Sequence, residues 1–137
     1  MNTVKSFRHQ HSEIVSLVNE LSLQLSATNL KHKAKEVRSL LSKFSGKLSV
    51  HLSMEDQNLY PFLMNHPDIR IRNLAHRFTE EMGGILSSFS QYKTHWPTHM
   101  EIADRPEEFV KETRELFAVL SERIDRENNE LYPLLER

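Results

Sequence analysis

Residues 51–61 read HLSMEDQNLYP, and residues 123–133 read RIDRENNELYP. The two stretches align without a gap, so that Glu55 falls on Glu127 and both stretches end in Leu-Tyr-Pro. Position 51 is a histidine, whereas the matching position 123 is an arginine. This internal repeat indicates that the chain carries two copies of one structural unit.

The repeat extends into the segments that precede these two stretches. Phe7-x-x-x-His11-x-x-Ile14 aligns with Phe78-x-x-x-Met82-x-x-Ile85, so that Met82 stands at the place of His11. We therefore expect each copy to be a helical hairpin, and the two hairpins to surround a central site with matched polar positions.

Apolar residues recur at spacings of three and four along the chain, as in amphipathic helices. Three glycines and five prolines provide few of the turns that separate strands. The expected helices cover residues 4–25, 32–62, 71–92 and 106–134, with breaks at 26–29, 65–67, 96–97 and 104–106. The pattern predicts an all-α fold, an antiparallel up-down four-helix bundle, as a single domain over residues 1–137. Within the third helix, Gly83-Gly84 suggests a close approach of two helices.

Composition excludes several classes of function. The chain has 137 residues, a net charge of −1 and no cysteine. It therefore lacks disulfides, thiolate metal sites and thiol nucleophiles, and it has no basic excess for binding nucleic acid. No apolar run reaches the roughly 20 residues of a membrane-spanning helix, and the first residues do not resemble a secretory signal. We expect a cytoplasmic protein without a nucleic-acid or membrane partner.

Ionisable side chains interrupt the predicted apolar faces. At 100° per residue, His11 lies on the inward face of the first helix, His51 and Glu55 on that of the second, and Glu127 on that of the fourth. Burying unpaired carboxylates is costly, so this combination favours a bound cation. Imidazole and carboxylate ligands without sulfur suit iron, manganese or zinc.

Each of these residues also has an ordinary interpretation. His51 and Glu55 fit an exposed i, i+4 pair, Glu127 fits an acid at the edge of the core, and His11 fits a buried histidine bonded to a neighbour. Glu81 lies roughly 80° from the centre of the third helix's apolar face, which fits either a flanking ligand or an exposed acid. The remaining histidines are assigned to polar faces or turns: His9, His32, His66, His76, His95 and His99.

His11, the His51-x-x-x-Glu55-x-x-x-Leu-Tyr-Pro unit and the Glu127-x-x-x-Leu-Tyr-Pro unit resemble the hemerythrin-like (HHE cation-binding) domain family. The resemblance covers nearly the whole chain and implies a four-helix bundle around a non-haem iron site, usually di-iron. It implies His11 and His51 as terminal ligands and Glu55 as a bridging carboxylate, with Glu127 where the other bridge originates. Members of the family bind dioxygen, sense oxygen, nitric oxide or iron, or handle peroxide.

The sequence departs from the full pattern of that family, which places two histidines on the third helix and one on the fourth. Phe78 and Met82 hold the inward places of the third helix, and Arg123 stands opposite His51 in the repeat. Either the site takes one ion, or Glu81 and another oxygen ligand complete a di-iron site. The expectation here is two ions, because two inward carboxylates are placed to bridge them.

The sequence thus predicts a non-haem iron protein that binds or senses oxygen, nitric oxide, iron or redox state; it favours a protein without enzymatic activity but leaves an enzyme open. One alternative is a small di-iron oxidase or peroxidase that acts on dioxygen or peroxide. A second alternative is a metal-free helical interaction module, and a protein partner or homodimer is left open. The sequence shows neither a substrate pocket nor a dedicated acid–base residue, which favours the non-enzymatic interpretation.

Overall fold

The computed structural model describes residues 3–136, and the regular structure within this range is entirely helical. The long helices are α1 (Thr3–Ser22), α2 (Ala27–Met54) and α7 (Pro106–Arg126). The shorter helices are α3 (Tyr60–Met64), α4 (Ile69–Met82), α5 (Ile85–His95), α6 (His99–Asp104) and α8 (Tyr132–Leu135). Two π-helical turns, η1 (Glu55–Leu59) and η2 (Glu127–Leu131), join α2 to α3 and α7 to α8. The all-α prediction is confirmed, with more elements than the four expected.

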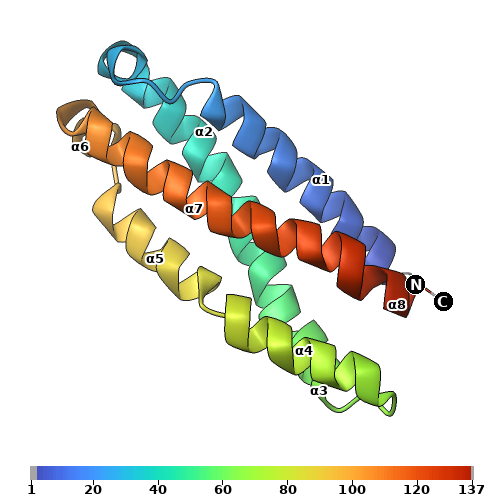
Figure 1. The fold of residues 1–137 in the computed structure, drawn as a ribbon. Coiled ribbons are helices and arrows are strands. Elements are labelled where there is room, and N and C mark those ends of the chain that lie inside the picture. The colour runs from blue at the N-terminus through green and yellow to red at the C-terminus, as the bar shows by residue number, and fades with distance from the viewer. Residues whose placement is uncertain (1–2, 137) are drawn as a thin grey trace.

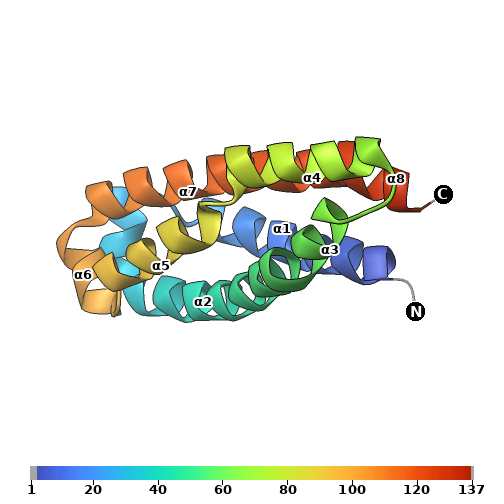
Figure 2. The ribbon, with the colours of Figure 1, turned by 90° about the horizontal axis from the view of Figure 1, so that it is seen from below.

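The long helices lie alongside one another and give the protein an elongated shape. Figure 1 shows α1, α2 and α7 side by side, with α4 and α5 following one another along α7. In Figures 1 and 2 both termini lie at one end, and α6 lies at the opposite end. Within residues 3–136, no helix is both long and apolar enough to cross a bilayer.

Side-chain caps explain two helix starts that differ from those expected. The Ser26 hydroxyl accepts a hydrogen bond from the Asn29 N–H, so α2 begins at Ala27, and the expected start near His32 coincides with a kink at Lys33 inside α2. Thr98 and Glu101 form a capping box that starts α6 in a segment where the sequence predicted no helix. Both differences arise because short polar side chains satisfy N–H groups at helix starts.

The third predicted helix is divided into α4 and α5 at Gly83-Gly84. A Cβ atom at Gly83 would collide with the carbonyl oxygen of Thr79, one turn earlier. Nothing lies within contact distance of a Cβ atom at Gly84. The glycine pair therefore marks a break in the helix, and the expectation of a close approach between two helices is wrong.

The core has an aromatic end and a polar end. Near α6, Trp96 packs edge-on against Phe109, and further along the bundle Phe44 of α2 packs edge-on against Phe89 of α5. Towards the termini, the core instead holds ionisable side chains: His11, His51, Glu55, Arg123 and Glu127, each 0–2% exposed. In the middle of α1, Ile14 and Leu17 are buried, whereas Val15 is exposed.

Candidate metal centre

Four side chains from four helical elements meet in the polar end of the core. His11 comes from α1, His51 from α2, Glu55 from η1 and Glu127 from η2. One ligand atom of each lies within 4.8 Å of the others. His11 Nε2 is 3.0 Å from Glu127 Oε1, and His51 Nε2 is 3.1 Å from Glu55 Oε1. The structure thus brings together the four residues that the sequence placed on inward faces.

The two carboxylates occupy equivalent positions, because each begins a π-helical turn. The N–H of Tyr60 bonds to the carbonyl of Glu55, and the N–H of Tyr132 bonds to the carbonyl of Glu127. The residue after each tyrosine is a proline, which has no N–H and clashes with the carbonyl four residues earlier in an α-helix. The wider turn accommodates that proline, and such turns are frequent at functional sites. The repeated Leu-Tyr-Pro segment was the sequence signal for this geometry.

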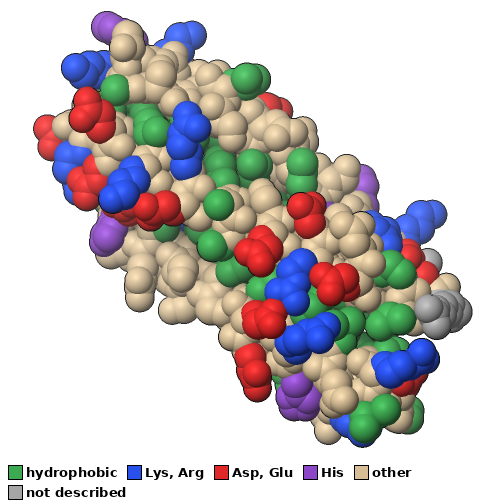
Figure 3. Space-filling view, in the orientation of Figure 1, with side chains coloured by type: hydrophobic (Ala, Val, Ile, Leu, Met, Phe, Trp, Pro, Cys, Tyr) green, Lys and Arg blue, Asp and Glu red, His purple; other side chains and the backbone are tan. Residues whose placement is uncertain are grey.

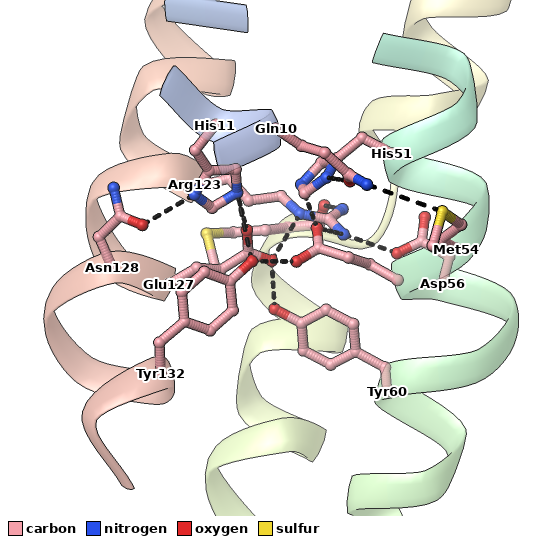
Figure 4. A network of polar contacts seen from close by, with 12 residues as sticks. Gln10, His11, His51, Met54, Asp56, Tyr60, Arg123, Glu127, Asn128 and Tyr132 are labelled. Carbon is pink, nitrogen blue, oxygen red and sulfur yellow. Dashed lines mark hydrogen bonds and ion pairs between the residues drawn. The ribbon is translucent and has the colours of Figure 1, made fainter. Parts of the chain in front are cut away.

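Each imidazole is oriented by a side-chain amide on a neighbouring helix (Figure 4). His11 Nδ1 is 2.8 Å from Asn128 Oδ1, and His51 Nδ1 is 2.5 Å from Gln10 Oε1. An amide oxygen only accepts, so each Nδ1 atom donates to its amide and each Nε2 atom faces the centre. Sequence reasoning missed Gln10 and Asn128, because contacts between helices leave no signal in residue spacing.

The atoms facing the centre fit a cation. His51 Nε2 and Glu127 Oε1 are buried and have no hydrogen-bond partner in the described part of the chain. Each Nε2 atom lies about 3 Å from a carboxylate oxygen, a contact that requires a positive charge, either on a protonated imidazole or on a cation bound between the two atoms. Neighbouring ligands on an ion with bonds of about 2.1 Å are themselves about 3 Å apart at a right angle. Two imidazoles and two carboxylates suit iron, manganese or zinc.

Arg123 is the buried cation of this site. Its Nη2 lies 3.2 Å from Glu55 Oε1, and its Nε lies 3.1 Å from Glu127 Oε2. Nη2 also donates to Asp56 Oδ1 at 2.7 Å, and Nη1 donates to the carbonyl of Met82 at 3.3 Å. Figure 4 shows the guanidinium in the middle of the network. The sequence identified Arg123 only as the residue matching His51, whereas the structure makes it a partner of both carboxylates.

Each tyrosine of the repeat donates a hydrogen bond to the glutamate of the opposite half. Tyr60 donates to Glu127 Oε2, and Tyr132 donates to Glu55 Oε2, both at 2.6 Å. Burial and the two carboxylates raise the pKa of each phenol, so both remain protonated donors at neutral pH. Each hairpin therefore holds the carboxylate of the other one.

The two carboxyl groups have opposite pKa shifts. Burial opposes ionisation of Glu55, but its contacts with His51, Arg123 and Tyr132 lower its pKa to about 2. Burial and the charge of Glu55 raise the pKa of Glu127, and His11 and Arg123 offset this only in part. Glu55 is therefore the more firmly ionised of the two carboxylates.

Glu81 lies outside this group. Its side chain is 46% exposed and is 2.5 Å from Arg126 Nη1, whose guanidinium also reaches Glu130. Acidic and basic side chains lie close together on the face drawn in Figure 3. The contacts of Arg126 with Glu81 and Glu130 are surface ion pairs of this type. Phe78 and Met82 are buried, as expected. The other histidines are exposed or half-buried: His9, His32, His66, His76, His95 and His99.

An apolar hollow of about 710 Å³ adjoins the polar centre. Phe7 lines the hollow, and its ring packs edge-on against His51 at 5.5 Å and stacks on Tyr132 at 6.3 Å between centroids. Exposed Phe62 and half-buried Leu134 lie on other sides of the hollow. Phe7 therefore forms the wall between the hollow and the four candidate ligands.

Comparison with known protein families places the polar centre in a wider context. The family model described as the hemerythrin HHE cation binding domain matches residues 2–135, nearly the whole chain. Comparison with curated proteins gave no match, and neither did comparison with solved structures.

Proposed function

This chain belongs to the hemerythrin HHE cation-binding domain family, and we propose that it binds iron through His11, His51, Glu55 and Glu127. The observation that carries this proposal is the buried set of ligand atoms within 4.8 Å of one another, two of them without a hydrogen-bond partner among residues 3–136. The same donors accept manganese or zinc. Iron is preferred here because it is the metal that the family resemblance implies.

We further propose that the iron serves sensing or reversible binding rather than turnover. The polar groups around the four ligands are engaged in holding them: Tyr60, Tyr132 and Arg123 bond to the carboxylates, and Gln10 and Asn128 bond to the imidazoles. A bound iron ion supplies coordination positions for a small ligand such as dioxygen or nitric oxide. The hollow behind Phe7 gives a small neutral molecule an apolar approach.

The alternative function is that of an oxidase or peroxidase, and the hollow is the observation that favours it. Its volume falls within the range of small-molecule sites, about 300–1,000 Å³. Phe7, which is buried, stands between a molecule in the hollow and the ligands. Sustained consumption of peroxide by the iron-loaded protein favours the enzyme. A reversible spectral change on adding nitric oxide, without consumption of peroxide, favours the sensor.

The test of metal binding is elemental analysis of protein purified without chelator and reloaded anaerobically with Fe(II). We expect bound iron and a higher melting temperature, because a ligand that binds only the folded state stabilises it. His51→Ala and Glu55→Gln should abolish both effects.

The matched controls are His76→Ala and Glu80→Gln, which change an exposed pair with the same His-x-x-x-Glu spacing and should leave both effects intact. Absence of bound metal together with an unchanged melting temperature would support the metal-free interaction module instead.

A further inference from the structure

We infer that the Arg123 guanidinium takes the place of a second cation, so that the site holds a single metal ion. The inference rests on the proposed function, because it concerns how many ions the four ligands hold. In the internal repeat, Arg123 occupies the position of His51, one helical turn before the carboxylate of its own half. Its guanidinium lies between the two carboxylates that would have to bridge two ions.

The carboxylate oxygens that a second ion would need as ligands already accept hydrogen bonds. Arg123 engages Glu55 Oε1 and Glu127 Oε2, and the hydroxyl of Tyr60 takes a further bond to Glu127 Oε2. The guanidinium is permanently charged and presents its donors in a rigid plane. It is 2% exposed, and two further contacts, to Asp56 and to the carbonyl of Met82, hold it in place. A second ion would therefore have to displace a buried arginine.

The atoms left without partners lie on the histidine side of the site. His51 Nε2 and Glu127 Oε1 have no hydrogen-bond partner within the described range, and Glu127 Oε1 faces His11. The equivalent of His11 on α4 is Met82, whose side chain offers no imidazole. One ion fits between the two imidazoles. On the opposite side of the two carboxylates, Arg123 occupies the place of a second ion.

The charges also balance with one divalent ion. Glu55, Glu127 and half-buried Asp56 carry three negative charges, and Arg123 carries one positive charge. Because both Nδ1 atoms donate to amide oxygens and both Nε2 atoms serve as ligands, the imidazoles are neutral. One divalent cation makes this group neutral, whereas two would leave an excess of two positive charges in the core, at a large desolvation cost.

The experiment measures metal stoichiometry after anaerobic Fe(II) loading and desalting, by elemental analysis. We expect one equivalent in the wild type and one in Met82→His, which adds an imidazole on α4 but keeps Arg123. We expect two equivalents in Arg123→His/Met82→His, in which the guanidinium is gone and both halves carry imidazoles. The single change Arg126→His, on the surface of α7, is the control for adding a histidine near the site and should leave one equivalent.

The outcomes separate this inference from the proposed function. Wild-type protein that binds no metal contradicts the proposed function itself. Two equivalents in the wild type or in Met82→His overturn the inference while metal binding stands, and these variants keep Arg123 and so do not depend on folding of the double variant. A folded double variant, checked by circular dichroism, that still binds one equivalent shows that Arg123 is not what excludes a second ion.

Discussion

The two halves of the internal repeat share a backbone and differ in charge. In the first half, His51 precedes Glu55 by one turn, and in the second half Arg123 precedes Glu127 by one turn. Both glutamates begin a π-helical turn. The first half therefore offers a metal ligand where the second half offers a fixed cation.

This difference shows that a repeated backbone does not imply repeated side-chain chemistry. The repeated Leu-Tyr-Pro segments produce a pseudo-symmetric frame in which Tyr60 and Tyr132 each support the opposite carboxylate. At the position one turn before each glutamate, the first half carries the proposed metal ligand His51 and the second half carries Arg123, which we infer to stand in for a second ion. The following predictions, all on chelator-treated protein unless stated, test how unequal the two halves are.

The largest effect is expected from removing the cation of the second half. Arg123→Leu leaves two buried carboxylates without their common partner and should lower the free energy of unfolding by about 3–5 kcal/mol. His51→Leu removes the imidazole and its hydrogen bond to Gln10, and should cost about 0.5–1.5 kcal/mol. Urea unfolding of both variants measures the difference. Equal losses would mean that Arg123 and His51 play equivalent roles.

Tyr60 and Tyr132, which each bond to the glutamate of the opposite half, should instead contribute equally to the free energy of unfolding. Tyr60→Phe and Tyr132→Phe each remove one 2.6 Å hydrogen bond to a carboxylate and keep the ring. Each should cost about 1.5–3 kcal/mol of unfolding free energy, the range for hydrogen bonds to charged groups. In double-mutant cycles, Tyr132→Phe should couple to Glu55→Gln but not to Glu127→Gln. Coupling of Tyr132 to Glu127 would contradict the crossed arrangement.

The amides that orient the imidazoles should affect metal affinity. Gln10→Ala frees the His51 ring and Asn128→Ala frees the His11 ring, and each should weaken Fe(II) binding about 10- to 100-fold. Competition with a chelating dye, on protein loaded anaerobically, measures the loss. Asn129→Ala, an exposed neighbour of Asn128, is the matched control and should leave affinity unchanged. An affinity loss in the control equal to that of Asn128→Ala would rule out orientation as the cause.

As pH falls, Glu55 and Glu127 should change the free energy of unfolding in opposite directions. The pKa of Glu55 is about 2 in the folded protein, below its ordinary value of 4.5, so the stability it contributes is full above 4.5 and is lost as pH falls towards 2. The pKa of Glu127 is raised on folding, so its ionisation penalty is present above the raised pKa and disappears as pH falls through it.

Glu55→Gln should therefore flatten the loss of stability as pH falls below 4.5, and Glu127→Gln should flatten the loss of stability as pH rises above 4.5 towards the raised pKa. The slope for one proton is at most about 1.4 kcal/mol per pH unit. Urea unfolding at a series of pH values measures both slopes. Flattening of the same pH range by both variants would contradict the opposite shifts.

The smallest effect is expected at Glu81, which belongs to neither half of the site. Glu81→Gln removes an exposed ion pair with Arg126 and should change the free energy of unfolding by at most about 1 kcal/mol. The Fe(II) stoichiometry should stay that of the wild type. Loss of one equivalent in this variant would place Glu81 among the ligands.

Much of the candidate site could be predicted from residue spacing. His11, His51, Glu55 and Glu127 were assigned to inward faces because the helical period relates each one to apolar neighbours on its own helix. Glu81 was ambiguous for the same reason, since a position about 80° from the centre of a face is compatible with either direction. Its actual partner, Arg126, is on another helix.

The sequence by itself determined the helical fold, the pseudo-twofold repeat and the four inward ionisable residues, because periodicity and proline placement act locally along the chain. Only the tertiary structure decided that Arg123 lies between both carboxylates, that each tyrosine bonds to the glutamate of the opposite half, and that Gln10 and Asn128 orient the imidazoles. These contacts depend on how far each helix is rotated and shifted against its neighbours. Packing of the whole core sets that relation, and no spacing within one helix records it.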